Sequence, residues 1–390
     1  MVRGRGLAYG PMSDGFIELM TSFEGRSALE RMGTLTGAFR SVVNLARSVG
    51  PLQLQMLEDV WRVAKKAKPD VVVVHPKVPG GLDIADELNV PAIIAPLFPQ
   101  YVATSAFPAI GFPDLPLGSA YRLATYKLVS GVTNLLSRGP IHAWRRNNEL
   151  ERRPKHLRHG RDRHGELIPA VHGFSASLCS RPADWPESAM VAGPWSLKSE
   201  SWKPPAALLK FLADGATPVY VGFGSMAGRK PRELTGIVLE ALALSGQRGV
   251  IATGWGGLTE GQLPGTVFAV RDVPHSWLFP RVSAVVHHGG AGTTTAGLRA
   301  GCPTVVCPFF ADQPFWGRRI HALGAGPRPI PQRRLTAPRL ADAITSAVHD
   351  VNMRVTAGLL KQQLAAESRL DRTVALIESL SASGRCAAER

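Results

Sequence analysis

Short uninterrupted apolar runs alternate with amphipathic stretches along most of the chain. In the first half, residues 71–74 and 92–95 have the composition of buried strands, and the stretch between them, through Ile84 and Leu88, has helical spacing. A strand, a helix and a strand at this spacing form a βαβ unit, which requires a parallel sheet. The first half is therefore expected to be α/β.

A second and longer series of apolar runs begins after residue 217. Five predicted strands with helical patterns between them make a doubly wound domain, and they cover residues 218–225, 249–253, 266–270, 284–286 and 304–306. A final helical pattern over residues 337–380 is expected to finish this domain and cross back to the first one.

These patterns divide the chain into four parts. We predict an N-terminal α/β domain over 1–195, a linker rich in Lys, Ser and Pro over 196–205, a second α/β domain over 206–365, and a C-terminal helix and tail over 366–390. Residues 97–137 mix Pro, Gly and aromatic side chains in a pattern that is neither clearly helical nor clearly extended.

Composition narrows the class of protein. The chain has 390 residues, 45% of them hydrophobic, which is enough for two globular domains. It has no apolar run of about 18 residues and no signal-peptide pattern, so we expect cytoplasmic residence. Four cysteines without CxxC spacing predict neither a structural disulfide nor a metal site.

The chain is strongly basic, with a net charge of +15 and a pI near 10.2. The densest basic run extends from Arg145 to Arg163 and contains a few acidic residues. A solvated face, a peripheral contact with an anionic membrane and nucleic-acid binding are all open interpretations of such a run. Because no DNA or RNA recognition motif accompanies it, nucleic acid is not an expected partner.

The most informative segment is residues 285–294, Val-Val-His-His-Gly-Gly-Ala-Gly-Thr-Thr. An apolar run that opens into small residues predicts a buried strand leading into a helix whose first turn approaches a ligand closely. Backbone N–H groups at such a helix start bind phosphates. A purely structural turn is the alternative for the glycines alone, and the residues proposed to hold a diphosphate are His288, Gly290, Ala291, Gly292 and Thr293.

Four blocks together carry a resemblance to a known family. Residues 273–280, 287–294, 297–304 and 308–317 closely resemble the nucleotide-sugar-binding half of family 1 glycosyltransferases, most of all the sterol 3-beta-glucosyltransferase branch. The specific match runs from Val219 to Pro331, whereas the N-terminal half matches loosely. The resemblance implies two facing Rossmann-like domains of GT-B type, with UDP-glucose or a related nucleotide sugar as donor substrate and no permanently bound cofactor.

The resemblance also assigns donor-site roles. It implies that Gly224 and Ser225 meet the diphosphate, that Val273 holds the uracil through its backbone with His275 near the ribose, and that Asp312 and Gln313 read the hexose hydroxyls. An ordinary Gly-Ser turn is the alternative at 224–225. Ser276 stands where an acidic residue is more usual, and Ala311 where glycine is.

The acceptor is expected to be a hydrophobic small molecule such as a sterol, a polyketide or a lipid. The resemblance implies that residues 97–137 line the acceptor pocket, and ordinary packing of a loop and a helix is the alternative interpretation.

The implied reaction is an inverting transfer without a metal, in which a base deprotonates the acceptor hydroxyl and His288 stabilises the departing diphosphate. The resemblance places that base upstream of Met1, so the N-terminal domain is expected to be incomplete and to leave strands unpaired. His75 is a weak candidate base, because a histidine at a strand end is more often structural. The alternative function is a nucleotide-sugar-binding remnant without the general base.

Overall fold

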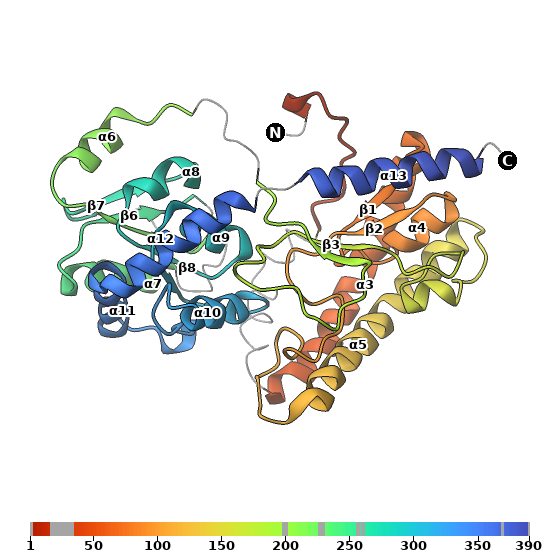
Figure 1. Cartoon of the computed structure of the whole chain (residues 1–390), viewed down its shortest axis with the longest axis horizontal. Helices are drawn as coiled ribbons and strands as arrows, with labels where there is room; N and C mark the ends of the chain where they lie inside the picture. Colours follow the sequence, from red (N-terminus) through yellow and green to blue (C-terminus); the bar gives the residue numbers. More distant parts are fainter. Residues whose placement is uncertain are drawn as a thin grey trace. The chain divides into compact units, whose positions relative to one another are not determined.

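The computed structural model describes residues 3–15, 35–196, 202–224, 231–254, 258, 262–367 and 370–388. The chain divides into two compact units. Unit 1 contains residues 1–173, 181–192 and 369–390, and unit 2 contains residues 174–180 and 193–368. Figure 1 shows the elements of both units along the chain.

Unit 2 is built on a five-stranded parallel sheet with the order β7-β6-β5-β8-β9. The strands are β5 (Val219–Gly222), β6 (Gly249–Ala252), β7 (Val267–Val270), β8 (Val285–His287) and β9 (Thr304–Val306). All five predicted strands are confirmed. The order reverses between β5 and β8, which is the switch point at which doubly wound sheets bind ligands.

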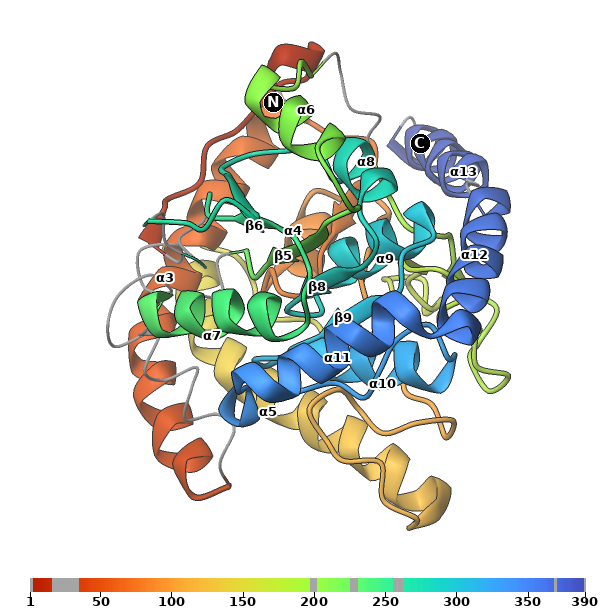
Figure 2. The same cartoon turned by 90° about the vertical axis from the view of Figure 1, so that its left-hand side faces the viewer.

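Alternating side chains of β5 explain why helices cover both faces of this sheet. Val219 and Val221 face a core shared with helices α7 (Pro231–Leu244) and α11 (Ala337–His349), whereas Tyr220 faces a core shared with α6 (Ala206–Ala213) and α8 (His275–Leu278). Figure 2 shows α7 and α11 lying side by side. The other helical elements of this unit are η3 (Phe279–Arg281), α9 (Ala291–Ala300), α10 (Gln313–Ala322), η4 (Gln332–Arg334) and α12 (Val351–Ala366).

Unit 1 holds a four-stranded parallel sheet in simple sequence order, β1-β2-β3-β4. The strands are β1 (Val72–Val74), β2 (Ala92–Ile94), β3 (Ala170–His172) and β4 (Ala189–Val191). The predicted β1 and β2 are confirmed, and the parallel sheets of both units confirm the α/β class. Within the described residues β1 pairs with β2 alone, and Val73 on this edge strand is 50% exposed.

Two long helices dominate the rest of unit 1. Helices α3 (Leu35–Ala67) and α5 (Gly118–Asn147) pack together, with Trp61 and Trp144 in edge contact at 5.6 Å between ring centroids. The sequence pattern missed the start of α5, because residues 97–137 gave no clear periodicity. The remaining elements are η1 (Arg3–Arg5), α4 (Gly81–Glu87), η2 (His156–His159) and α13 (Asp371–Ala388).

The two units do not coincide fully with the predicted domains. Residues 174–180 group with unit 2, and the chain returns to unit 1 at residue 369, before α13. A hydrogen bond from the Ser381 hydroxyl to Asp70 ties α13 to the start of β1. Half of the predicted linker, residues 197–201, lies outside the described residues. Among the described helices none combines the length and the apolar character that a membrane crossing requires.

The basic run from Arg145 to Arg163 is not simply a solvated face. Arg145 is buried and pairs with Glu87 and, at 3.4 Å, with Asp83, and Arg153 lies 3.1 Å from the same Asp83 carboxylate. Burial raises the pKa of Asp83, and the two arginines partly offset that shift. For Arg145 and Arg153 the solvated, membrane and nucleic-acid interpretations are therefore wrong, because both guanidinium groups hold helix α4 in place.

Candidate functional site

The candidate site lies at the carboxyl ends of β5 and β8, where the strand order of unit 2 reverses. β5 ends at Gly222 and is followed by Phe223 and Gly224, and β8 runs directly into the loop before α9. The predicted glycine-rich motif is thus confirmed as a strand, a short loop and a helix. Ser225, also predicted for this site, lies outside the described residues.

The ring of His288 lies between two glycines from different elements. A Cβ on Gly224 would lie 3.5 Å from its Cε1 atom, and a Cβ on Gly290 would lie 2.7 Å from its Nε2 atom. The second distance is shorter than real Cβ contacts, so a side chain at position 290 would displace the ring. The end of β5, the loop after β8 and the start of α9 therefore meet around His288.

Helix α9 begins without a side-chain cap. Its N-cap residue, Gly290, has extended backbone angles and offers no side-chain acceptor, and the first return bond of the helix runs from Thr294 N–H to Gly290 O at 2.9 Å. The N–H groups of Ala291, Gly292 and Thr293 precede that bond, and Gly292 is exposed. An uncapped helix start with solvent access is suited to an anionic ligand.

Burial keeps the histidines of this loop neutral. It lowers the pKa of His288 to about 4, and the charge of His275 acts in the same direction. Burial also holds the pKa of the fully buried His287 well below its usual range, and His287 Nδ1 accepts the Gly289 N–H at 2.9 Å. At neutral pH His288 is therefore a hydrogen-bond donor without a charge. Its Nδ1 atom is buried and has no hydrogen-bond partner in the described part of the chain.

Helix α10 brings Asp312 and Gln313 to the same edge of the sheet. A Cβ on Gly289 would lie 3.0 Å from the backbone oxygen of Gln313, so the start of α10 touches the loop before α9. The Gln313 Oε1 atom accepts the N–H groups of Phe309 and Phe310 at 2.7 and 3.2 Å. Its oxygen therefore holds the loop after β9.

Asp312 is oriented by a residue that the sequence reasoning missed. The indole Nε1 of Trp316 donates to Asp312 Oδ2 at 3.0 Å, and Trp316 itself is 1% exposed. The four-residue spacing places the two side chains next to each other at the start of α10. The preceding residue, Ala311, has φ of 57°, a left-handed conformation that favours glycine, so this departure from the family pattern places strain beside the site.

Val273 and His275 lie near this centre but differ in exposure. Val273 is buried in the core shared with α6 and α8. The His275 ring stacks on Phe279 at 4.3 Å between centroids and meets Tyr220 edge-on at 5.8 Å. Burial lowers the pKa of His275. The binding roles of Val273 and His275 that the resemblance implies stay predictions.

His75 follows β1 in unit 1, and its Nδ1 atom accepts the Lys77 N–H at 3.2 Å. Burial and the neighbouring Lys77 lower its pKa. In this neutral tautomer Nε2 already carries the proton. The geometry therefore favours the structural interpretation, and the catalytic base stays unassigned.

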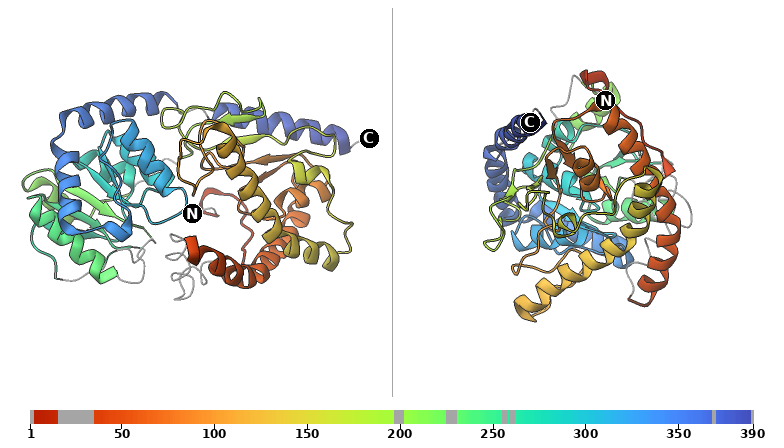
Figure 3. Two further views of the ribbon diagram at one scale, coloured as in Figure 1. Left: turned by 90° about the horizontal axis from the view of Figure 1, so that it is seen from below. Right: turned by 90° about the vertical axis from the view of Figure 1, so that its right-hand side faces the viewer.

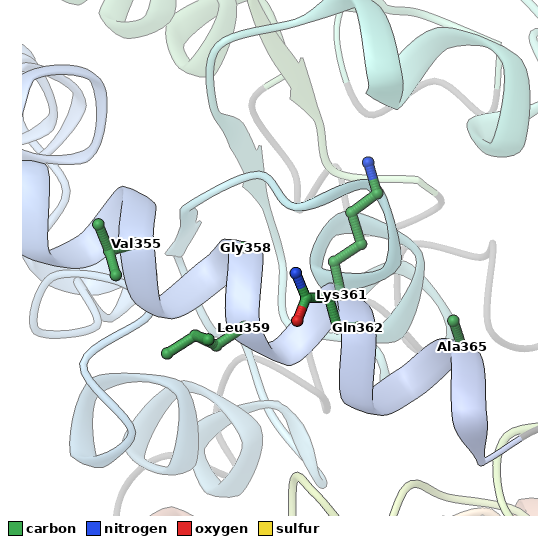
Figure 4. A pocket seen from close by; sticks show the side chains of 6 residues that line it. All are labelled: Val355, Gly358, Leu359, Lys361, Gln362 and Ala365. Atoms are coloured by element: carbon green, nitrogen blue, oxygen red, sulfur yellow. The ribbon is translucent and has the colours of Figure 1, made fainter.

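A hollow of about 520 Å³ occurs elsewhere in unit 2, on the outer side of α12. Figure 4 shows the α12 side chains that line it, Val355 and Leu359 among them. Lys361 from this helix packs on Gly301, which ends α9. The hollow thus adjoins the end of α9 opposite to the uncapped start, about 15 Å away. It belongs to a different surface from the candidate site.

Within the described residues, no three side chains among His, Cys, Asp and Glu are arranged to hold a metal ion. The groups that meet at the candidate site are backbone N–H groups, a neutral imidazole, one carboxylate and one amide. These groups match an anionic ligand that also carries hydroxyls.

Known proteins are similar to this chain in sequence or in fold. Residues 251–380 match the family model described as the C-terminal domain of erythromycin biosynthesis protein CIII-like proteins. The sterol 3-beta-glucosyltransferase UGT80A2 of Arabidopsis thaliana is 40% identical over 286 residues, which are 73% of this chain and 44% of that protein. The chain thus spans less than half the length of this curated relative.

Solved structures with low sequence identity share the two-domain fold. The crystal structure of the glycotransferase of kitacinnamycin matches with a TM-score of 0.65 and 19% identity, over 97% of this chain and 88% of that chain. The Streptomyces sp. SF2575 glycosyltransferase SsfS6, complexed with thymidine diphosphate, matches with a TM-score of 0.56 and 20% identity, over 96% of this chain and 88% of that one.

Proposed function

We propose that the chain belongs with the sterol 3-beta-glucosyltransferase-like proteins of the family 1 glycosyltransferases, and that it transfers a hexose from a UDP-linked donor to a hydroxyl of a hydrophobic acceptor. The observation that carries this proposal is the ring of His288, held between Gly224 and Gly290 at the uncapped start of α9. Glucose is the proposed sugar, because the curated relative is a glucosyltransferase.

In this proposal the diphosphate binds at the start of α9. The N–H groups of Ala291, Gly292 and Thr293 donate to its oxygens, and neutral His288 adds one N–H donor. Donors fixed in this way stabilise the negative charge that grows on the diphosphate as it leaves. The small residues let the phosphates approach the backbone.

The hexose is proposed to bind at the start of α10. Asp312 accepts from sugar hydroxyls through its carboxylate, which Trp316 orients, and Gln313 donates through its amide nitrogen. A carboxylate acceptor beside an amide donor distinguishes sugars by the positions of neighbouring hydroxyls, because a misplaced hydroxyl leaves a buried polar group unpaired.

The proposed chemistry is a single displacement that inverts the anomeric carbon. The acceptor oxygen forms a bond to that carbon, the bond from the carbon to the phosphate oxygen breaks, and the diphosphate leaves with the electron pair. The acceptor proton passes to a general base. No permanently bound cofactor takes part. The acceptor class, a sterol or a similar lipid, rests on the name of the curated relative.

The test is a pair of variants that separates the two parts of the donor. His288→Ala is expected to weaken UDP binding about tenfold or more, because a hydrogen bond to a charged group contributes about 1.5–3 kcal/mol. Asp312→Ala is expected to leave the Kd for UDP within about twofold while abolishing the preference among UDP-sugars. Isothermal titration with UDP, thymidine diphosphate and UDP-glucose measures both effects.

Exposed residues of α11 supply matched controls. His349→Ala and Asp342→Ala change the same residue types at surface positions of this unit, and neither is expected to alter UDP affinity. Equal losses of UDP affinity in the His288 and Asp312 variants would contradict the assignment.

A second candidate function is nucleotide-sugar binding without transfer. It is favoured by the His75 tautomer, in which Lys77 occupies Nδ1 and Nε2 already bears a proton. UDP-glucose binding without turnover on any sterol or polyketide acceptor would support this candidate over the transferase.

A further inference from the structure

Helix α5 of unit 1 carries cationic residues and no acidic ones. Over its 30 residues it has Arg122, Lys127, Arg138, Arg145 and Arg146, and neither Asp nor Glu. Two of these cations have partners, since Arg122 pairs with Asp114 at 3.2 Å and Arg145 with the α4 carboxylates. Lys127, Arg138 and Arg146 are exposed. Figure 3 shows α5 as one long amber helix from two further sides.

The middle of α5 also exposes an apolar stripe, which we define as Leu128, Val132 and Leu135. These side chains are 55%, 39% and 71% exposed. Their spacings of four and three residues place them on one face of the helix. No residue from Lys127 to Leu136 is buried. Single exposed leucines are ordinary, whereas three on one helix face indicate a surface that meets an apolar phase.

A positive field extends from the apolar stripe along the second half of α5. His142 reports it, because Arg138, Arg158 and Arg152 add to burial in lowering its pKa. Arg152 and Arg158, which follow α5 in the chain, are themselves exposed. Of the exposed cations, Lys127 and Arg138 lie beside the apolar stripe on α5 itself, one residue before Leu128 and three residues after Leu135.

We propose that the apolar stripe of α5, flanked by Lys127 and Arg138, docks unit 1 on the surface of an anionic lipid bilayer. An interfacial helix places apolar side chains among the acyl chains and cations at the headgroups. Each cation near an anionic surface adds to this attraction, which decays within a Debye length. A nucleic acid would use the cations and leave the leucines in water, so the combination favours lipid. The proposal is independent of transferase activity.

Vesicle sedimentation of the full chain tests the proposal. We expect binding to vesicles that contain about 30% phosphatidylserine to be at least tenfold stronger than binding to pure phosphatidylcholine, and to weaken as salt rises. Lys127→Glu with Arg138→Glu is expected to reduce binding about tenfold or more, and Leu135→Glu to reduce it to a similar degree.

Leu359→Glu on α12 is the matched control. Leu359 is 54% exposed and lies on a helix of unit 2, so this variant introduces the same charge elsewhere and is expected to bind vesicles as the unmodified chain does. Circular dichroism and UDP titration show whether each variant is folded. These readouts also separate a failure of this proposal from a failure of the proposed function.

Four results would overturn the proposal. They are absence of vesicle binding, equal binding to neutral and anionic vesicles, an equal loss in Leu359→Glu, and binding of the unmodified chain to an acidic protein in preference to lipid. The stripe would instead belong to the acceptor site if Leu135→Glu lowered turnover of a water-soluble acceptor in the absence of vesicles.

Discussion

Trp316 orients the Asp312 carboxylate, the group that we propose binds the sugar. The hydrogen bond from its indole is 3.0 Å long, and Phe174 packs on the same ring at 5.9 Å between centroids. Trp316→Phe removes the N–H donor and keeps most of the ring volume. We expect the KM for UDP-glucose to rise about three- to tenfold, and the Kd for UDP to stay within about twofold, because the lost hydrogen bond contributes about 1 kcal/mol or somewhat more.

Trp144→Phe is the matched control for Trp316→Phe. Trp144 is fully buried in unit 1, and its Nε1 atom has no partner in the part of the chain that the structure describes. This substitution is expected to change stability and to leave the KM for the donor unaltered. If Trp316→Phe also left that KM unaltered, Asp312 would not need the indole to orient it.

Single residues also show which parts of the candidate site could be predicted from the sequence alone. His288 and Gly290 were singled out by the glycine-rich turn after an apolar run, and Gln313 by the family resemblance. The structure places His288 against Gly290 and Gln313 against the neighbouring Gly289. The inward acceptor role of Gln313 Oε1 and the bond from Trp316 were not predictable. Both depend on how the start of α10 packs on the loop after β9, which no local pattern encodes. The binding roles themselves stay predictions.

Helix α9 lets stability and binding be separated at one position. A Cβ on Gly292 would meet nothing within 4 Å, and alanine favours a helix over glycine by up to about 1 kcal/mol. Gly292→Ala is therefore expected to stabilise unit 2. If the diphosphate packs against the first turn of α9, the same methyl group obstructs it, and UDP affinity should fall about tenfold. Urea unfolding and calorimetric titration measure the two effects.

Gly236→Ala in α7 provides the comparison. Its Cβ would also meet nothing within 4 Å, and it lies in a helix interior away from the loop of His288. This variant should show the gain in stability without the loss of UDP affinity. Unchanged UDP binding in Gly292→Ala would place the diphosphate away from the start of α9.

Whole elements differ in how clearly the sequence encodes them. Each strand of the unit 2 sheet is a mostly buried apolar run, so all five were predictable. β3 and β4 were missed, because each contains a single β-branched residue, whereas β1 contains three and β2 two. The start of α5 was missed because its leucines are exposed whereas Thr125, Tyr126 and Ser137 are buried, which removes the helical period.

Buried neutral histidines occur in both units and make the whole molecule sensitive to mild acid. Burial lowers the pKa of His172 in unit 1 to about 4, and that of His288 in unit 2 to about 4. The fully buried His287 is shifted in the same direction. The His172 ring also stacks on Trp185 at 4.3 Å between centroids, so the charged form of the ring would be poorly solvated.

Because these pKa values are lower in the folded chain than the ordinary value of about 6.5, the unfolded chain binds more protons between pH 6.5 and 4. Their contribution to stability is complete above pH 6.5 and is lost as the pH falls toward 4, by up to about 1.4 kcal/mol per pH unit for each histidine.

We expect the free energy of unfolding in urea to fall by about 1–3 kcal/mol between pH 7 and 5.5, a window above the titration of ordinary carboxylates. His172→Gln should reduce the pH dependence of the unfolding free energy by about the contribution of one histidine. His349→Gln at the exposed end of α11 should not change that dependence. An unfolding free energy that is constant over this window would mean that the buried rings take up protons without cost. That result would contradict the neutral state assigned to His288.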